Sequence, residues 1–133
     1  MANTTSVQIL VDGPRNVVLK YEGTLDTSDL SKETVVDPAL LSDMEINGVK
    51  ASQLRINKIN YDVEAGLAVN LYWDATTDVI IWNLYGRGEV NACKYGGLVN
   101  NSGTGKTGKI LADTQGYTSG TLTFTIILEL VKQ

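Results

Sequence analysis

The sequence predicts an all-β protein, an antiparallel β-sandwich of the jelly-roll kind with about eight strands. The first observation is the alternation in residues 121–132, which places five apolar side chains on one face: Leu122, Phe124, Ile126, Leu128 and Leu130. A period of two is typical of a strand with one buried face, and a strand this long is expected to lie centrally in its sheet. The second observation is that short alternating segments separated by turn residues fill the chain, with no long helical period.

Seven further strands are expected before this last one, at residues 7–12, 16–23, 53–63, 67–73, 79–85, 89–94 and 110–112. The first two flank Asp12-Gly13-Pro14, which is a turn signal, so we expect them to pair as a hairpin. The apolar parity slips within residues 53–63, and this slip predicts a β-bulge near Asn57 and Lys58. Strand order remains open, so jelly-roll and immunoglobulin-like sandwiches are both compatible with this pattern.

The pattern breaks between the second and third of these strands. Residues 24–50 are rich in Ser, Thr and Asp, with a short apolar pair at Val35-Val36. Asp37 before Pro38 is typical of an N-cap followed by proline at the first helical position, so we expect one short helical turn over residues 38–43. Asn47-Gly48 is a further turn signal. Long excursions of this kind tend to be functional.

Length and composition indicate one globular domain. The 133 residues are 43% hydrophobic and 20% charged, which is ordinary for a single domain with its own core. We expect one domain over residues 1–133, with a flexible N-terminus (1–6) and long loops at 24–50 and 95–109. A net charge of −4 argues against a nucleic-acid binder with a basic surface, and no apolar run approaches a membrane span. Residues 1–8 lack the features of a signal peptide, so we expect a soluble product made in a cytosol.

The chain contains no histidine, which removes the commonest general base and metal ligand and the usual serine and cysteine triads. We therefore expect no enzymatic activity, no metal and no cofactor. Cys93 is the single cysteine and is interpreted as a small core or half-buried residue. Asp74 and Asp78 flank a short loop and could share a calcium ion, although solvated turn aspartates are the better interpretation.

Residues 102–107 (SGTGKT) end like a nucleotide-binding P-loop. The full pattern needs a glycine where Asn100 stands, and a helix should follow, whereas Gly108 comes next within a strand-rich region. We therefore interpret this stretch as a surface loop. Gly86-Arg87-Gly88 could form a small anion-binding nest, but the end or bend of a strand is the better interpretation.

The tryptophans are expected in the core, because Trp73 and Trp82 fall on the inward parities of adjacent strands, and Ile80 and Leu84 share the parity of Trp82. An exposed sugar-binding platform is the alternative. The tyrosines are better candidates for contacts with another chain; these are Tyr72, Tyr85, Tyr95 and Tyr117.

Several motifs recur together from residue 35 to residue 132. They are Val35-Val36-Asp37-Pro38, the strand Val69-Asn70-Leu71-Tyr72-Trp73-Asp74, the turn Gly86-Arg87-Gly88, the pair Gly96-Gly97 and the final alternating strand ending at Lys132. In this combination the chain resembles small β-sandwich virion proteins encoded by tailed bacteriophages. The motifs are structural glycines, a tryptophan and strand patterns, so the resemblance implies a virion component and transfers no catalytic residue.

Within a virion the resemblance and the acidic, compact character favour a capsid decoration (cement) protein, assembled in the host cytoplasm. Its partners would be the major capsid protein or other virion proteins, with no nucleic acid and no membrane, and it would form a homo-oligomer, a trimer or a dimer. Candidate contact residues lie in the loops and the terminal turn: Thr27, Asp29, Lys32, Tyr95, Lys106 and Tyr117. Ile127 and Val131, on the second face of the last strand, hint at a further contact. The alternatives are a neck, tail or fibre component, a carbohydrate-binding module and, as a third class, an enzyme.

Overall fold

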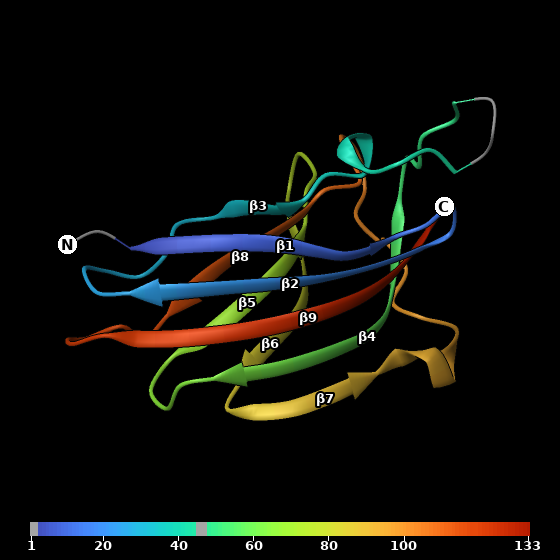
Figure 1. Ribbon diagram of the computed structural model, residues 1–133. Helices are drawn as coiled ribbons and strands as arrows, with labels where there is room; N and C mark the ends of the chain where they lie inside the picture. The colour runs from blue at the N-terminus through green and yellow to red at the C-terminus, as the bar shows by residue number, and fades with distance from the viewer. Residues whose placement is uncertain (1–2, 45–47) are drawn as a thin grey trace.

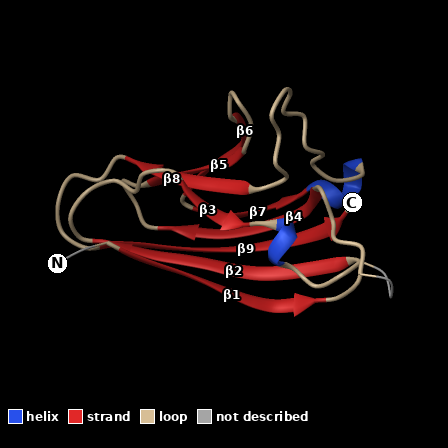
Figure 2. Cartoon of the chain, turned by 90° about the horizontal axis from the view of Figure 1, so that it is seen from above, coloured by secondary structure: helices blue, strands red, loops and turns tan. Residues whose placement is uncertain are grey.

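Two antiparallel sheets packed face to face make up the protein. The computed structural model describes residues 3–44 and 48–133. One sheet has five strands in the order β1 (Thr4–Asp12), β2 (Asn16–Leu25), β9 (Leu122–Lys132), β4 (Leu54–Val63) and β7 (Arg87–Asn91). The other has four, in the order β3 (Glu33–Val36), β8 (Ile110–Gln115), β5 (Ala68–Trp73) and β6 (Val79–Tyr85). Figure 1 shows the five-stranded sheet from β1 at the top to β7 at the bottom, and Figure 2 shows the second sheet lying over it.

The connections define a jelly roll. Strands β2 to β9 form two four-stranded layers, β2-β9-β4-β7 and β3-β8-β5-β6, and the chain changes layer after each of these strands except between β5 and β6. This is the double Greek-key arrangement, and all the pairs are antiparallel. The predicted fold class is confirmed, as are the central position of the last strand and the hairpin of β1 with β2. Strand β1 is a ninth strand added outside β2.

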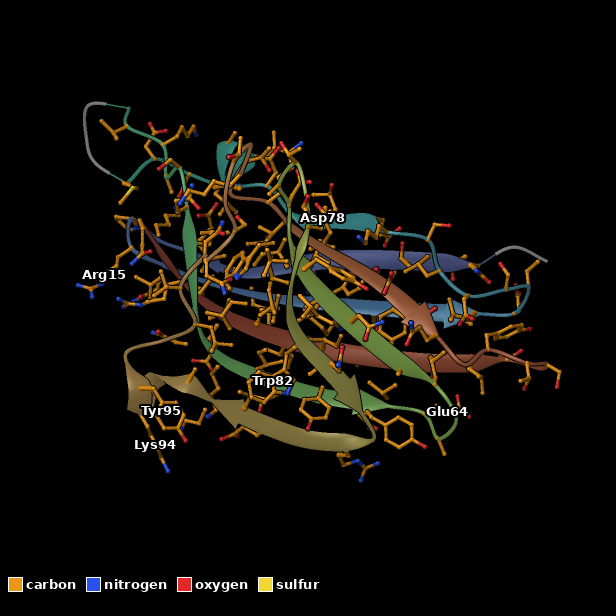
Figure 3. All side chains as sticks on the ribbon, turned by 180° about the vertical axis from the view of Figure 1, so that it is seen from behind. Arg15, Glu64, Asp78, Trp82, Lys94 and Tyr95 are labelled. Atoms are coloured by element: carbon orange, nitrogen blue, oxygen red, sulfur yellow. The ribbon has the colours of Figure 1, made fainter. Side chains whose placement is uncertain are left out.

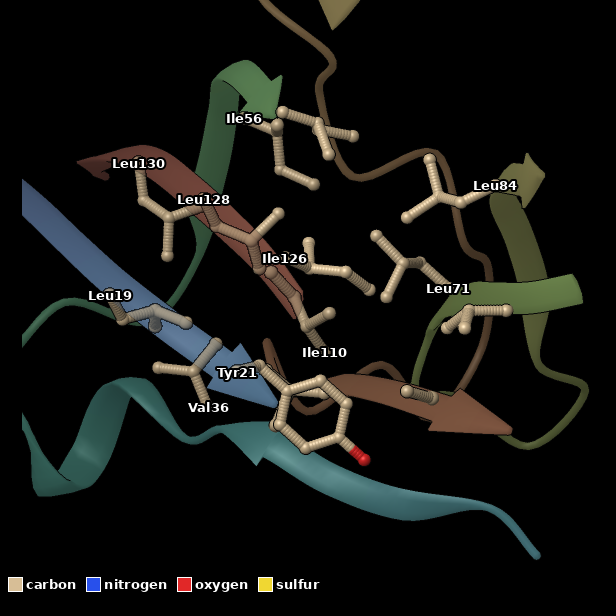
Figure 4. Close-up of a cluster of buried hydrophobic side chains, with 14 of the residues drawn as sticks. Leu19, Tyr21, Val36, Ile56, Leu71, Leu84, Ile110, Ile126, Leu128 and Leu130 are labelled. Carbon is tan, nitrogen blue, oxygen red and sulfur yellow. The ribbon is translucent and has the colours of Figure 1, made fainter. Parts of the chain in front are cut away.

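The core lies between the two sheets, where the alternating side chains of β9 meet those of β5 and β8 (Figure 4). Phe124, Ile126 and Leu128 are at most 1% exposed, as the alternation predicts. Burying each such side chain stabilises the fold by about 1.5–3 kcal/mol. Gly23 makes room for one of them, because a Cβ atom there would lie 2.5 Å from Cζ of Phe124.

A hydrogen bond joins the two sheets beside the core. The hydroxyl of Tyr21 on β2 donates to Oε1 of Glu33 on β3 at 2.5 Å. Burial raises the pKa of Tyr21 far above its usual value, and the acceptor Glu33 raises it further. This bond also shows that β3, the outer strand of the smaller sheet, packs over β2.

One end of the sandwich is closed around a buried lysine. The side chain of Lys132 at the end of β9 is 0% exposed, and its ammonium donates to Oδ1 of Asp12 at 2.8 Å and to the carbonyl oxygens of Gly13 and Ser42 at 2.7 Å each. Asp12 accepts two further hydrogen bonds from Ser42, through its amide at 2.9 Å and its hydroxyl at 2.8 Å. The network therefore joins the ends of β1 and β9 to the segment that follows η1 (Pro38–Leu40).

Three sequence-based expectations were wrong about local structure. Strand β3 was missed within the expected loop of residues 24–50, so the described chain has nine strands. The expected strand 89–94 is instead β7 followed by the 3-10 helix η2 (Ala92–Tyr95). Residues 4–6 of the expected flexible N-terminus belong to β1, where backbone pairing with β2 fixes them.

Other local expectations hold in outline. The helical turn is shorter than predicted, a 3-10 helix over Pro38–Leu40, and the Asp37 side chain caps it by accepting from the amide of Ala39. The ladder between β4 and β9 shifts register between Ile56 and Lys58, as the parity slip predicts. The turn expected at Asn47-Gly48 falls partly on residues 45–47, outside the described residues.

Candidate interaction surfaces

Three of the six sequence-predicted contact residues lie together at one end of the sandwich. Oδ1 of Asp29 accepts from the amide of Tyr117 at 3.0 Å and from the Thr114 hydroxyl at 3.2 Å. The amide of Thr27 donates to Oδ1 of Asn3 at 3.1 Å. The loop that carries these residues is therefore fastened to β8 and to the chain just before β1, and its polar groups hold the fold together.

Lys32 belongs to a polar network on the outer face of the four-stranded sheet. Its ammonium lies 2.9 Å from Oδ2 of Asp78 and 4.2 Å from the ring centroid of Tyr72, close enough for a cation–π interaction. The Tyr72 hydroxyl donates to Asp113 at 3.1 Å, and the Asn70 amide donates to the same carboxylate at 3.0 Å. Because these groups satisfy one another, Lys32 fixes the sheet surface instead of presenting a free charge.

The electrostatics of this network favour its charged form. The hydrogen bond to Asp78 raises the pKa of Lys32 above its usual value. Hydrogen bonds from the amide of Ala75 and from Lys32 lower the pKa of Asp78. Burial and the neighbouring Asp113 raise the pKa of Tyr72. The Lys32–Asp78 pair is therefore fully ionised at neutral pH, although both partners are partly exposed and the pair contributes about 1 kcal/mol or less.

The loop that carries Lys106 is held by the neighbouring loop of residues 74–78. The amide of Thr76 donates to the carbonyl of Thr104 at 3.1 Å, and the Thr107 hydroxyl donates to Oδ2 of Asp74 at 2.7 Å. Strand β8 follows at residue 110, where a P-loop would open a helix. The prediction of a surface loop is therefore confirmed. Within the parts of the chain that the structure describes, no group of three or more His, Cys, Asp or Glu side chains could hold a metal ion.

The most exposed aromatic side chains lie on β6 and η2. Tyr95 is 82% exposed, Tyr85 65% and Trp82 40%, and Val99 just after η2 is 58% exposed. We call these four the β6–η2 residues. Figure 3 shows Trp82 and Tyr95 on the side of the molecule along which β7 runs. Tyr95 and Tyr85 are thus surface residues as predicted.

The expectation that Ile80 and Trp82 are both core residues was wrong, because β6 contains a bulge and is an edge strand. The pairing of β5 with β6 shifts register so that Leu71 faces Trp82 while the next residue, Tyr72, faces Ile80. The bulge turns Ile80 to the outer face beside Tyr72. Trp82 keeps the inner side, but β6 is an edge strand, so the ring remains accessible at the rim. Only Leu84 of the three expected inward residues is buried, as Trp73 is on β5.

Cys93 was also placed wrongly by its sequence context, since it is exposed on η2. The sequence suggested a further contact at Ile127 and Val131 on β9. Val131 is 5% exposed, and Ile127 is half-buried on the outer face of the five-stranded sheet.

An open groove of about 560 Å³ lies at the turn between β6 and β7. Tyr85 lines it together with charged side chains of β4 and β7, and Arg87 stands 3.4 Å from Asp62 across part of it. An aromatic ring beside carboxylates and a guanidinium can bind the faces and hydroxyls of a sugar. Sequence reasoning missed this groove, because nothing in the local pattern indicates that β4 and the β6–β7 turn meet.

The second exposed apolar surface is β1. Val7 is 41% exposed, Ile9 44%, Leu10 48% and Val11 48%. The alternation in the sequence predicted a strand here with one buried face. It did not indicate that the opposing sheet leaves this face partly exposed.

No protein-family model matches the sequence, and no curated protein matches it. Among solved structures the chain is similar to the Drosophila melanogaster CENP-C cupin domain, with 9% identity over 92% of this chain and 75% of that chain. The TM-score is 0.34, and a likeness at this level says nothing about function. No helix in the described residues is long and apolar enough to cross a membrane.

Proposed function

We propose that this chain is a non-enzymatic bacteriophage virion protein, a capsid decoration protein that binds the major capsid protein by burying surface. The motifs of residues 35–132 that resemble phage virion sandwiches support the class. The observation that carries the mode of action is the exposure of the β6–η2 residues, above all Tyr95 and Tyr85. Tyrosine and tryptophan are enriched among the side chains that dominate the energy of protein interfaces.

The binding would be a matter of area and anchoring and would involve no chemistry. Tyr95 and Val99 lie at the start of the loop 95–109, and Tyr85 is the last residue of β6, at the opposite end of β7 from η2. Truncating one aromatic anchor of an interface costs about 2 kcal/mol, which weakens binding about 30-fold. The loop of residues 26–32 is a weaker candidate than the sequence indicated, because Asp29 and Lys32 already have partners in the fold.

The test is co-sedimentation of the purified protein with capsids that lack it. We expect saturable binding at a fixed ratio to the major capsid protein, and about 30-fold weaker binding for Tyr95→Ser. Leu40→Ser is the matched control, because Leu40 is 84% exposed on η1 and lies outside the proposed surface. Absence of binding to capsids would refute the decoration role, and binding to isolated necks, tails or fibres would place the protein there.

A carbohydrate-binding function is the second candidate, and the exposure of Trp82 together with the groove beside Tyr85 favours it. It predicts saturable quenching or enhancement of tryptophan fluorescence by a glycan and loss of that signal in Trp82→Phe. If a broad glycan screen gives no saturable binding, this candidate is excluded.

A further inference from the structure

Strand β1 extends the five-stranded sheet past the edge of the sheet that covers it. The smaller sheet ends at β3, which packs over β2 through the Tyr21–Glu33 hydrogen bond. Val7 and Ile9 stand opposite Tyr21 and Leu19, two core residues of β2, so they continue the inner, apolar face. They are nevertheless 41% and 44% exposed, so the opposing sheet leaves much of each side chain uncovered.

The outer edge of β1 is also without a strand partner. In the described chain β1 pairs only with β2, so alternate backbone amide and carbonyl groups along its nine residues face outward. Edge strands normally carry charges or are very short, which prevents pairing with other chains. Two of the other three edges follow this rule, since β7 carries Arg87 and Glu89 and β3 has four residues. The third, β6, is uncharged but is interrupted by a bulge, which also hinders edge pairing. From Thr4 to Val11, β1 has no charged side chain.

We propose that β1 pairs antiparallel with β1 of a second copy of this chain, across a two-fold axis at Val7, to form a continuous ten-stranded sheet. The ladder with β2 is regular from Thr4 to Ile9 and shifts register after Ile9. A two-fold axis at Val7 uses only the regular part. Val7 then faces Val7 of the second copy, and Thr5 faces Ile9. The inner faces of the two copies therefore lie side by side on the same side of the joined sheet.

Charge slightly favours this register over its neighbour. Glu22 stands opposite Ser6, and Lys20 stands opposite Gln8. With the axis at Val7, Ser6 pairs with Gln8 of the second copy, so each row across the sheet runs from Glu22 of one copy to Lys20 of the other. These charges are three strand spacings apart, about 14 Å, so they favour the register weakly. An axis at Gln8 would instead place the two copies of Lys20 in one row.

The proposed pairing ends with two copies, and this explains why an edge strand without charges does not lead to further association. A two-fold contact uses the same surface on both copies and leaves no edge of its kind free, whereas pairing β1 with another edge strand would continue into a filament. The occupant must be an extended backbone, because the unpaired groups are main-chain donors and acceptors.

Sedimentation velocity of the purified full chain tests the inference without any capsid, so its outcome is independent of the proposed function. We expect a dimer, and we expect Val7→Lys to weaken it at least about a hundredfold, because two ammonium groups would face each other across the axis. Ile80→Lys is the matched control, since Ile80 is 48% exposed on an edge strand of the other sheet, and it should leave the dimer intact. A cooperative unfolding transition in each variant would show that both variants fold.

Disulfide cross-linking tests the register. Cys93 is exposed, so Cys93→Ser is the background in which Val7→Cys and Gln8→Cys are compared under mild oxidation. Directly opposed residues have Cβ atoms about 4.5–5.5 Å apart, so Val7→Cys should form dimers readily and Gln8→Cys much more slowly. A monomeric wild-type chain, a dimer insensitive to Val7→Lys, or preferential cross-linking of Gln8→Cys would each overturn the proposal.

Discussion

Replacing Asp12 by Asn should destabilise the fold strongly, because it leaves the ammonium of Lys132 buried without a counter-charge. The Lys132 side chain is 0% exposed and the Asp12 side chain 27% exposed. Removing one partner of a buried ion pair costs about 3–5 kcal/mol. Since water reaches Asp12 and the Gly13 and Ser42 carbonyls remain as acceptors, we expect the low end, about 3 kcal/mol. Domains of this size have total stabilities of about 5–15 kcal/mol, so the change is large.

A double-mutant cycle separates the pair from its surroundings. Lys132→Met removes the buried charge and its desolvation cost, and it leaves neutral acceptors that water can reach, so we expect about 1–2 kcal/mol. The double variant should be more stable than the sum of the single changes by at least about 1.5 kcal/mol. Urea unfolding followed by the fluorescence of Trp73, which is 1% exposed, measures all four proteins.

The same pair gives the stability a defined pH dependence. Burial by itself would raise the pKa of Asp12, but the hydrogen bonds from Lys132 and Ser42 outweigh it and hold the pKa below the usual 3.8. The unfolded chain therefore takes up the proton first as the pH falls. The stabilisation by Asp12 is complete above about pH 5 and is lost as the pH falls through the folded-state pKa. The stability difference between the wild type and Asp12→Asn should shrink below about pH 4. A cost under about 1 kcal/mol at neutral pH, or a difference that persists in acid, would refute this account.

Three further predictions concern the core and the rim. Tyr21→Phe should cost about 1–2 kcal/mol, because the hydrogen bond to Glu33 is lost where little water can replace it; calorimetric unfolding measures this, and an unchanged midpoint would contradict it. Gly23→Ala should cost about 1–3 kcal/mol through crowding of Phe124, and urea unfolding that shows no loss would mean that the ring moves freely aside. Acrylamide should quench only part of the tryptophan emission, and Trp82→Phe should abolish the quenchable part; uniform quenching would mean that both tryptophans are accessible.

Much of the fold was predictable because period-two alternation is a local signal. The central position of β9 followed from Phe124 to Leu130 alone, and the parity slip in β4 located its bulge. The bulge in β6 could not be found in the same way. Ile80 and Ile81 are both apolar, so the alternation in this strand is compatible with either of them facing inward. Strand β3 was not predicted, because only Val35 and Val36 of its four residues are buried. Two adjacent buried residues are too few to show an alternation of period two.

The candidate surfaces were much less predictable, because they depend on which strands become neighbours. Residues 29 and 117 are 88 positions apart and meet only through the order of β3 and β8. Lys32 looked like a free loop cation and instead pairs with Asp78, 46 positions away. The exposure of β1 depends on the relative widths of the two sheets, five strands against four, and no pattern within β1 encodes the width of the opposing sheet.

The buried lysine and the exposed edge strand belong to one arrangement. Asp12 is the last residue of β1, and through Lys132 and Ser42 it fastens that strand to the end of β9 and to the segment after η1. A strand with half-exposed apolar residues and a single neighbour would otherwise fray, and ordering it at the moment of pairing would reduce affinity. Anchoring its end holds the backbone extended before a partner arrives. Asp12→Asn should therefore weaken the proposed dimer as well as the fold, although Asp12 lies outside the five residues that pair. If dimerisation were unchanged in that variant under conditions where it is folded, the anchor would serve stability alone.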